Sequence, residues 1–179
     1  LRRLFNVDPT IEEAPQFDFS AFLDEDVTII LDIGRLRESV QRAMVLVVLS
    51  QLWTALRRRG RRRGGESLPL VNVYLEDAGN VAGSEILDAL LSEGREFRVS
   101  MTLAMQFPQQ LADTDTRATT AGGDGATTYD EVLNNVGTIV TGQVGHDRKL
   151  AERLATDEIE SEKMAARLRQ LSAGQWLVS

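Results

Sequence analysis

An adjacent pair of carboxylates, Glu76 and Asp77, directly follows the apolar run Leu70–Leu75. Neighbouring residues at the end of a strand point in different directions, so the two acids are suited to different tasks. One can hold Mg²⁺ through its water shell, and the other can orient a water molecule against a phosphate. Acidic residues also simply mark the exit of a buried strand, and this structural interpretation stays open for the pair taken alone.

An arginine and a glutamine follow in the next part of the chain. Arg95 comes two residues after the end of the predicted helix Ser84–Glu93, and Gln106 directly follows a second apolar run, Val99–Met105. An arginine in this place can reach the nucleotide of a neighbouring subunit and stabilise the charge that develops on a transferred phosphoryl group. A glutamine at a strand tip can hydrogen-bond to a γ-phosphate. Taken separately, a solvated arginine and a loop glutamine are the simpler interpretations.

The elements that must position these side chains are short apolar segments alternating with helical patterns. This alternation predicts an α/β fold with a mostly parallel sheet and helices on both faces, with ligands at the carboxyl ends of the strands. We expect residues 1–179 to form a single domain with flexible loops at 57–65 and 112–128. The predicted strands are Val27–Ile33, Leu70–Leu75, Val99–Met105, Thr138–Gly142 and Gln175–Val178, and the predicted helices are Glu38–Arg59, Ser84–Glu93, Tyr129–Asn135, Asp147–Ala155 and Glu160–Leu171. The apolar strands are expected to be buried on both faces. We interpret Asp147 as an N-cap and His146 as a surface residue.

Composition excludes several classes of site. The 179 residues include no cysteine and one histidine, His146, which excludes disulfides, thiolate chemistry and multi-histidine metal sites. The net charge of −7 argues against a generic nucleic-acid binder, so any such contact must be local. Lys149 and Lys163 are the two lysines, and an acidic, lysine-poor chain is typical of a high-salt cytoplasm or of a GC-rich genome. No apolar run approaches the roughly 18 residues of a membrane span. We expect a cytoplasmic location, and the alternative is a parent protein that associates with a membrane through regions outside this chain.

A run of six arginines around Gly60 is the one concentrated basic feature of this acidic sequence. Such a cluster can contact DNA phosphates without reading the base sequence, with an affinity that falls as salt rises. It can equally be a solvated helix end whose side chains satisfy the terminal carbonyls. The six residues are Arg57, Arg58, Arg59, Arg61, Arg62 and Arg63.

Taken in order, these features resemble the second half of the HerA–FtsK motor ATPases, which include the archaeal HerA helicases and the coupling or conjugation ATPases of type IV secretion. The family's acid pair, its GR motif and its TQxP motif are similar to Glu76–Asn80, Gly94–Val99 and Met105–Pro108. The resemblance covers Val27 to Val178 and implies a RecA-like sheet.

The resemblance also implies roles for individual residues. Glu76 would be the acid associated with Mg²⁺, bound through water, and Asp77 the catalytic base. Arg95 would act as an arginine finger on a neighbouring subunit, and Gln106 would sense the γ-phosphate. The complete protein would bind ATP and Mg²⁺, form a ring that is hexameric in this family, and move DNA, with a nuclease or secretion and conjugation components as partners.

The sequence departs from the family in two respects. The family's acid pair is Asp then Glu, whereas here the shorter carboxylate stands second, where it reaches less far. No G-x-x-x-x-G-K-[ST] phosphate loop is present, and Gly142–Lys149 has the wrong spacing. We therefore expect a C-terminal portion of a motor domain, inactive alone although its parent hydrolyses ATP. A non-catalytic RecA-like scaffold or regulatory domain and a small α/β domain with an unrelated ligand are the alternatives.

Overall fold

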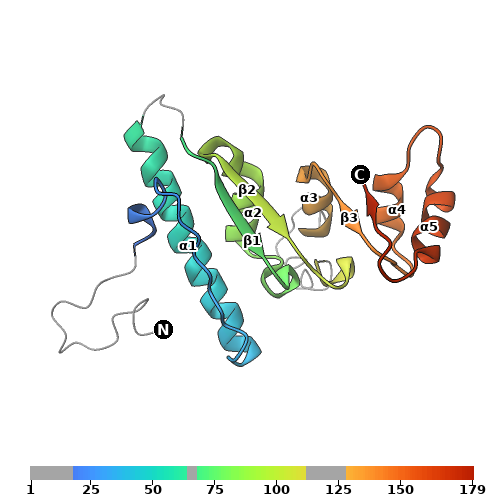
Figure 1. Cartoon of the computed structure of the whole chain (residues 1–179), viewed down its shortest axis with the longest axis horizontal. Coiled ribbons are helices and arrows are strands. Elements are labelled where there is room, and N and C mark those ends of the chain that lie inside the picture. The colour runs from blue at the N-terminus through green and yellow to red at the C-terminus, as the bar shows by residue number, and fades with distance from the viewer. Residues whose placement is uncertain (1–17, 64–67, 112–127) are drawn as a thin grey trace, which may run out of the picture. The chain divides into compact units, whose positions relative to one another are not determined.

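The computed structural model describes residues 18–63, 68–111 and 128–179 (Figure 1). The chain divides into two compact units, which are described separately. The first unit comprises Leu1–Val73 and Glu93–Met101, and the second comprises Tyr74–Ser92 and Thr102–Ser179. Helices and strands are mixed along the chain, as expected for the α/β class.

The first unit is built on one long helix, α1 (Glu38–Arg63), with the short helical turns η1 (Phe19–Ala21) and η3 (Gly94–Phe97) packed against it. The helix forms because its first six turns contain neither glycine nor proline and place apolar side chains three or four residues apart. The ring of Phe97 meets the ring of Trp53 edge-on, with centroids 5.1 Å apart. The buried side chains of α1 are Met44, Val48, Leu49, Leu52, Trp53, Ala55, Leu56 and Arg59.

Helix α1 is also apolar along much of its length, although polar residues interrupt its apolar runs. Among the described residues, Glu38–Arg61 is long and apolar enough to cross a membrane, with a mean hydropathy of 1.3 in its most apolar window. Of this most apolar window, a share of 39% is buried inside the protein. A buried core helix meets the same criterion, so the finding does not decide the location of the protein.

Two strands, β1 (Val71–Leu75) and β2 (Val99–Leu103), pair in parallel. Their direction follows from the hydrogen bonds at the two ends, because Val71 N donates to Arg98 O at the start and Ala104 N donates to Leu75 O at the finish. Side chains alternate between half-buried and exposed along both strands. The prediction of strands buried on both faces is therefore wrong, since the polar positions of V-N-V-Y-L and V-S-M-T-L face solvent.

The second unit has a helical core. Helices α4 (Arg148–Leu154) and α5 (Ser161–Gln170) pack on each other, and α3 (Thr128–Asn135) joins them. The unit also contains η2 (Ala78–Val81), η4 (Pro108–Leu111) and most of α2 (Glu85–Glu93). The core side chains are Ala82, Leu111, Tyr129, Val132, Leu133, Leu150, Ala151, Leu154, Met164 and Leu168.

The last two strands depart from the predicted sheet. β3 (Val140–Thr141) and β4 (Leu177–Val178) pair antiparallel, with Val140 opposite Val178. The described strands thus form two separate two-stranded sheets, one parallel and one antiparallel, rather than one mostly parallel sheet. The chain between β3 and β4 contains the two helices α4 and α5, and after them it runs back along β3 in the opposite direction.

The predicted strand Val27–Ile33 is not formed. The segment has no regular secondary structure, and the side chain of Ile30 is 85% exposed. Its composition favours a strand, but a strand needs a neighbour, and its backbone N–H groups donate no hydrogen bond to any described residue.

The predicted loop at 57–65 is wrong for its first seven residues, because α1 continues through Arg63. Arginine is a good helix former, and one glycine costs a helix only about 1 kcal/mol, so the run extends the helix rather than ending it. The predicted loop at 112–128 lies outside the described residues except for Thr128, which begins α3.

Candidate functional site

The carboxyl end of β1 carries the predicted acid pair. Glu76 directly follows the strand, and both Glu76 and Asp77 are exposed. Neither carboxylate has a hydrogen bond or an ion pair with another described residue. Asp77 has φ 49° and ψ 44°, in the left-handed region that non-glycine residues rarely adopt and that asparagine and aspartate tolerate best. The chain therefore turns sharply at Asp77 and leaves two uncommitted carboxylates at the strand end.

Gln106 lies at the same edge of the parallel pair as these acids. Ala104, which links β2 to Gln106, donates its N–H to Leu75 O and accepts a hydrogen bond from Ala78 N. These two bonds join the chain leaving β1 to the chain leaving β2. Gln106 is exposed, like the acids. The acid pair and Gln106 thus follow the carboxyl ends of two paired parallel strands, and the convergence of their side chains on a phosphate stays a prediction.

The turns that follow the two strands also pack together. η2 follows the acid pair, η4 follows Gln106, and the two turns are in contact. Gly79 of η2 is so close to Gln110 of η4 that a Cβ on the glycine would lie 2.7 Å from the Gln110 Cβ. Real Cβ atoms do not approach so closely, so a residue without a side chain is required at position 79. This contact joins the turn that follows the acid pair to the turn that follows Gln106.

Arg95 is placed differently. It is exposed, lies in η3 ahead of β2, and belongs to the first unit, whereas Gln106 follows β2 in the second unit. Arg95 and the acid pair thus belong to different units of the chain. A finger that acts on a neighbouring subunit has no need to lie near the acid pair of its own chain, so its predicted role stays a prediction.

The arginine run divides into side chains with different surroundings. Arg59 is buried, and it donates through Nε to Asp24 at 2.8 Å and through Nη2 to the carbonyl of Pro69 at 2.8 Å. Its remaining nitrogen, Nη1, is buried without a partner. Arg57 lies over the ring of Trp53 at 5.9 Å. Arg59 is therefore a structural residue, and its guanidinium is not available to DNA.

The exposed arginines share one face of α1. Arg57, Arg58 and Arg61 are exposed, and the spacing of three and four residues puts Arg61 next to both of the others. The side chains of Arg62 and Arg63 lie outside the described part of the chain. The described residues of the first unit carry eleven arginines and eight carboxylates, a net charge of +3, although the chain as a whole has −7.

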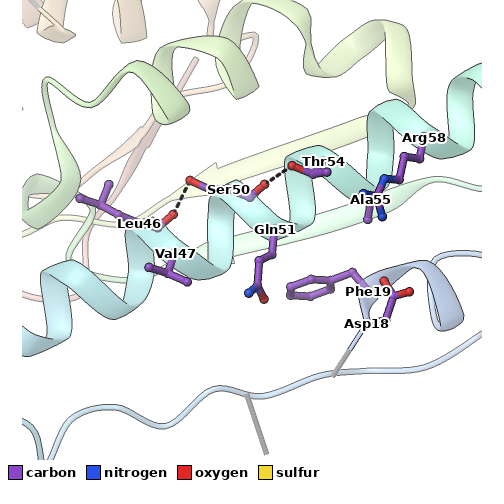
Figure 2. A pocket seen from close by; sticks show the side chains of 9 residues that line it. All are labelled: Asp18, Phe19, Leu46, Val47, Ser50, Gln51, Thr54, Ala55 and Arg58. Carbon is purple, nitrogen blue, oxygen red and sulfur yellow. Dashed lines mark hydrogen bonds between the residues drawn. The ribbon is translucent and has the colours of Figure 1, made fainter. Parts of the chain in front are cut away.

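A hollow of about 560 Å³ opens in the first unit between η1 and α1 (Figure 2). Of the predicted site residues, Arg58 lines it. The hydroxyls of Ser50 and Thr54 are committed to carbonyls four residues earlier in α1, at 2.7 and 2.9 Å. Gln51, which also lines the hollow, has its Oε1 buried without a hydrogen-bond partner. The hollow belongs to the first unit, whereas the acid pair belongs to the second. It is lined by Asp18, Phe19, Leu46, Val47, Ser50, Gln51, Thr54, Ala55 and Arg58.

A buried polar pair in the second unit was only half predicted. Asp147 caps α4 by accepting from Leu150 N at 2.9 Å, as predicted, and its other oxygen accepts from the Tyr129 hydroxyl at 2.7 Å. Burial raises the pKa of Tyr129 well above its ordinary value, and the bond to Asp147 adds to this. Sequence spacing carries no signal for a bond between α3 and the α4 cap. The pair is structural and lies beside Lys149, which binds Asp130 at 2.6 Å.

Metal binding has limited support in the geometry. Within the described residues, no group of three or more acidic or histidine side chains could hold a metal ion directly. Binding of Mg²⁺ to Glu76 through water needs fewer protein ligands and stays a prediction. His146 is exposed in the bend before α4, in agreement with its interpretation as a surface residue.

No protein-family model matches the chain, and no curated protein matches it.

Proposed function

We propose that this chain carries the acid-pair edge of an ATP-driven, DNA-translocating motor of the HerA–FtsK type. The observation that supports the proposal is that Glu76 and Asp77 follow the carboxyl end of one strand and Gln106 follows that of the parallel strand beside it. Ligands of α/β sheets bind at that edge. In the complete motor, β1 and β2 would be neighbours in a larger RecA-like sheet.

The two acids would divide the chemistry between them. Glu76 would hold Mg²⁺ through its water shell, and Asp77 would orient the attacking water and accept its proton. Gln106 would donate its amide N–H to the γ-phosphate. Because the sequence contains no G-x-x-x-x-G-K-[ST] loop, the phosphates of ATP would be held by another stretch of polypeptide. This chain by itself would then have no micromolar affinity for ATP, which calorimetry with Mg²⁺–ATP measures.

The acid pair can be tested on the chain itself with Mn²⁺ as a paramagnetic substitute for Mg²⁺. We expect Mn²⁺ to broaden the amide signals of residues next to Glu76, Asp77 and Gln106, and Glu76→Gln to remove the broadening. The chain offers a matched control, because Asp157 and Glu158 are also adjacent, exposed acids. Equal broadening around Asp157 and Glu158 would show that neighbouring acids alone account for the effect, and the site would be refuted.

DNA would be held by the exposed arginines of α1. Arg57, Arg58 and Arg61 point from one helical face of the unit that carries the positive charge. Each phosphate contact adds about 0.9 to the slope of log affinity against log salt, so replacing all three with serine should reduce that slope by up to about 3. Fluorescence anisotropy of labelled duplex DNA measures this.

The control for the DNA experiment is a triple variant of equal charge change in the second unit. Arg148, Arg167 and Arg169 are exposed there, and their replacement by serine should leave the slope unchanged. If both triple variants lowered the slope equally, the change in net charge alone would explain the effect, and the α1 face would have no specific role in DNA binding. Arg59 is left intact in both, because it is committed to Asp24.

Catalysis would take place between subunits, with Arg95 serving the nucleotide of a neighbour in a hexameric ring. A non-catalytic RecA-like scaffold is the second candidate, and the order Glu76 then Asp77 favours it because the second carboxylate is one methylene short of the family's reach. The Mn²⁺ experiment separates the two, since a scaffold has no reason to keep a cation at the acid pair.

A further inference from the structure

The segment Val27–Ile33 has the composition of a strand but no strand partner. Its side chains are apolar at five of seven positions, and Val27, Ile29, Ile30 and Leu31 are among the exposed large apolar residues. In Figures 1 and 2 it runs as an open trace alongside α1, within the first unit. Its backbone N–H groups donate no hydrogen bond to the described residues. A polypeptide edge of this kind is a template for another strand.

From these observations we infer that two copies of the chain associate by pairing their Val27–Ile33 segments antiparallel about a two-fold axis at Ile30. The register is set by the sequence, which nearly mirrors itself around Ile30. Ile29 then lies opposite Leu31 of the second copy, so that apolar side chains meet. Thr28 lies opposite Asp32 of the second copy, where its hydroxyl can donate to the carboxylate.

Charge complementarity selects this antiparallel arrangement. The segment is preceded by the acidic run Asp24–Asp26 and followed by Arg35 and Arg37, and all of these but the paired Asp24 expose their charges. In the antiparallel register, Glu25 faces Arg35 of the second copy, and the acidic end of each segment meets the basic end of the other. A parallel register would place acids opposite acids and arginines opposite arginines, which opposes pairing.

A lipid surface fits the segment less well. An apolar bilayer could accept the side chains, but it offers no partners to the unpaired backbone groups, whose burial without hydrogen bonds is unfavourable. A second strand offers contacts to the apolar side chains and hydrogen-bond partners to the backbone groups. A two-stranded ribbon alone is only marginally stable, so the dimer is weak and forms in concentrated solution. The inference does not depend on the acid pair or on ATP.

The absence of cysteine makes the register directly testable by cross-linking. In the Ile30→Cys variant, the two thiols lie opposite each other at the axis, with Cα atoms about 4.5–5.5 Å apart, which is within disulfide range. Ile30 is 85% exposed, so the variant should fold normally. Val140→Cys is the matched control, since Val140 is a strand-forming residue of the second unit that is 59% exposed.

We expect Ile30→Cys to form covalent dimers under mild oxidation at least about tenfold faster than Val140→Cys, because pairing raises the local thiol concentration. Sedimentation equilibrium should show reversible dimers of the unmodified chain, and Ile30→Lys, which puts two charges at the axis, should abolish them. Equal cross-linking rates at positions 30 and 140 would overturn the inference. So would faster cross-linking of Thr28→Cys than of Ile30→Cys, or dimers that persist in Ile30→Lys.

Discussion

The buried pair of Tyr129 and Asp147 offers a quantitative test of how the second unit is held together. The Tyr129 hydroxyl donates to Asp147 at 2.7 Å, and the same carboxylate caps α4 through Leu150 N. Tyr129 is 4% exposed and Asp147 is 8% exposed, so water cannot replace either partner. Removing one side of the pair therefore leaves the other side unsatisfied.

The expected magnitudes follow from these contacts. Tyr129→Phe removes a hydrogen bond to a charged acceptor and should lower the free energy of unfolding by about 1.5–3 kcal/mol. Asp147→Ala removes a helix cap, worth about 1 kcal/mol, and leaves the tyrosine hydroxyl buried without a partner, which costs about 1–3 kcal/mol more. The double variant loses the shared bond only once, so it should be less destabilised than the sum of the two single variants by about 1–2 kcal/mol.

Urea unfolding followed by far-ultraviolet circular dichroism at neutral pH measures all four free energies. Asp147→Ser is a useful control, because serine can still cap the helix while being too short to reach the tyrosine hydroxyl. It should recover the capping part of the loss and no more. If the two single variants added to within about 0.3 kcal/mol, the bond between Tyr129 and Asp147 would carry no coupling energy and the reasoning would be refuted.

Three further predictions concern single groups. Burial raises the pKa of Tyr129 and keeps its phenol protonated in the folded state, whereas the phenol ionises above about pH 10 in the unfolded state. The free energy of unfolding should therefore fall above that pH by up to about 1.4 kcal/mol per pH unit. Urea titrations at several pH values should show a smaller fall in Tyr129→Phe. Gly60→Ala should destabilise the protein by about 1–2 kcal/mol despite its better helix propensity, because the new Cβ would lie 2.9 Å from the Phe97 ring, and Phe97→Ala should cancel that loss in chemical denaturation. Arg59→Met should cost about 1–3 kcal/mol in thermal unfolding, and Asp24→Asn less, since the side chain of Asp24 is 41% exposed and that of Arg59 only 5%.

Helix positions were predictable because they depend on local spacing. The predicted helices Tyr129–Asn135, Asp147–Ala155 and Glu160–Leu171 correspond to α3, α4 and α5, with no end shifted by more than one residue. Asp147 was predicted as a cap from its place before an apolar pattern, and the structure confirms it. Interactions within one turn of helix are encoded by neighbours in sequence.

Strand pairing was predictable only in part, because it depends on residues far away in sequence. The runs at Leu70–Leu75 and Val99–Met105 form strands that pair in parallel, so the acid pair and Gln106 each follow the carboxyl end of a strand in that pair. Val27–Ile33 has equal strand propensity but no neighbour in the described structure. Propensity measures how well a residue fits a sheet, and it does not say whether a sheet edge is available.

The six arginines of the run around Gly60 have different surroundings, although they are alike in sequence. Sequence alone treats its six members alike, whereas burial separates Arg59, held by Asp24 and Pro69, from the exposed Arg57, Arg58 and Arg61. The continuation of α1 through this run follows from helix propensity, but the reason for Gly60 does not. It becomes clear only when Phe97, which is distant in sequence, is seen against the helix.

The two tryptophans give the chain a natural pair of optical labels. Trp53 lies in the first unit against Phe97 and is buried, whereas Trp176 lies in the second unit and is 66% exposed. Their emission maxima should therefore differ, the buried indole being bluer. Replacing the exposed Trp176 with phenylalanine would leave an emission signal that belongs to the first unit alone, so that the melting of this unit can be followed separately without an added dye.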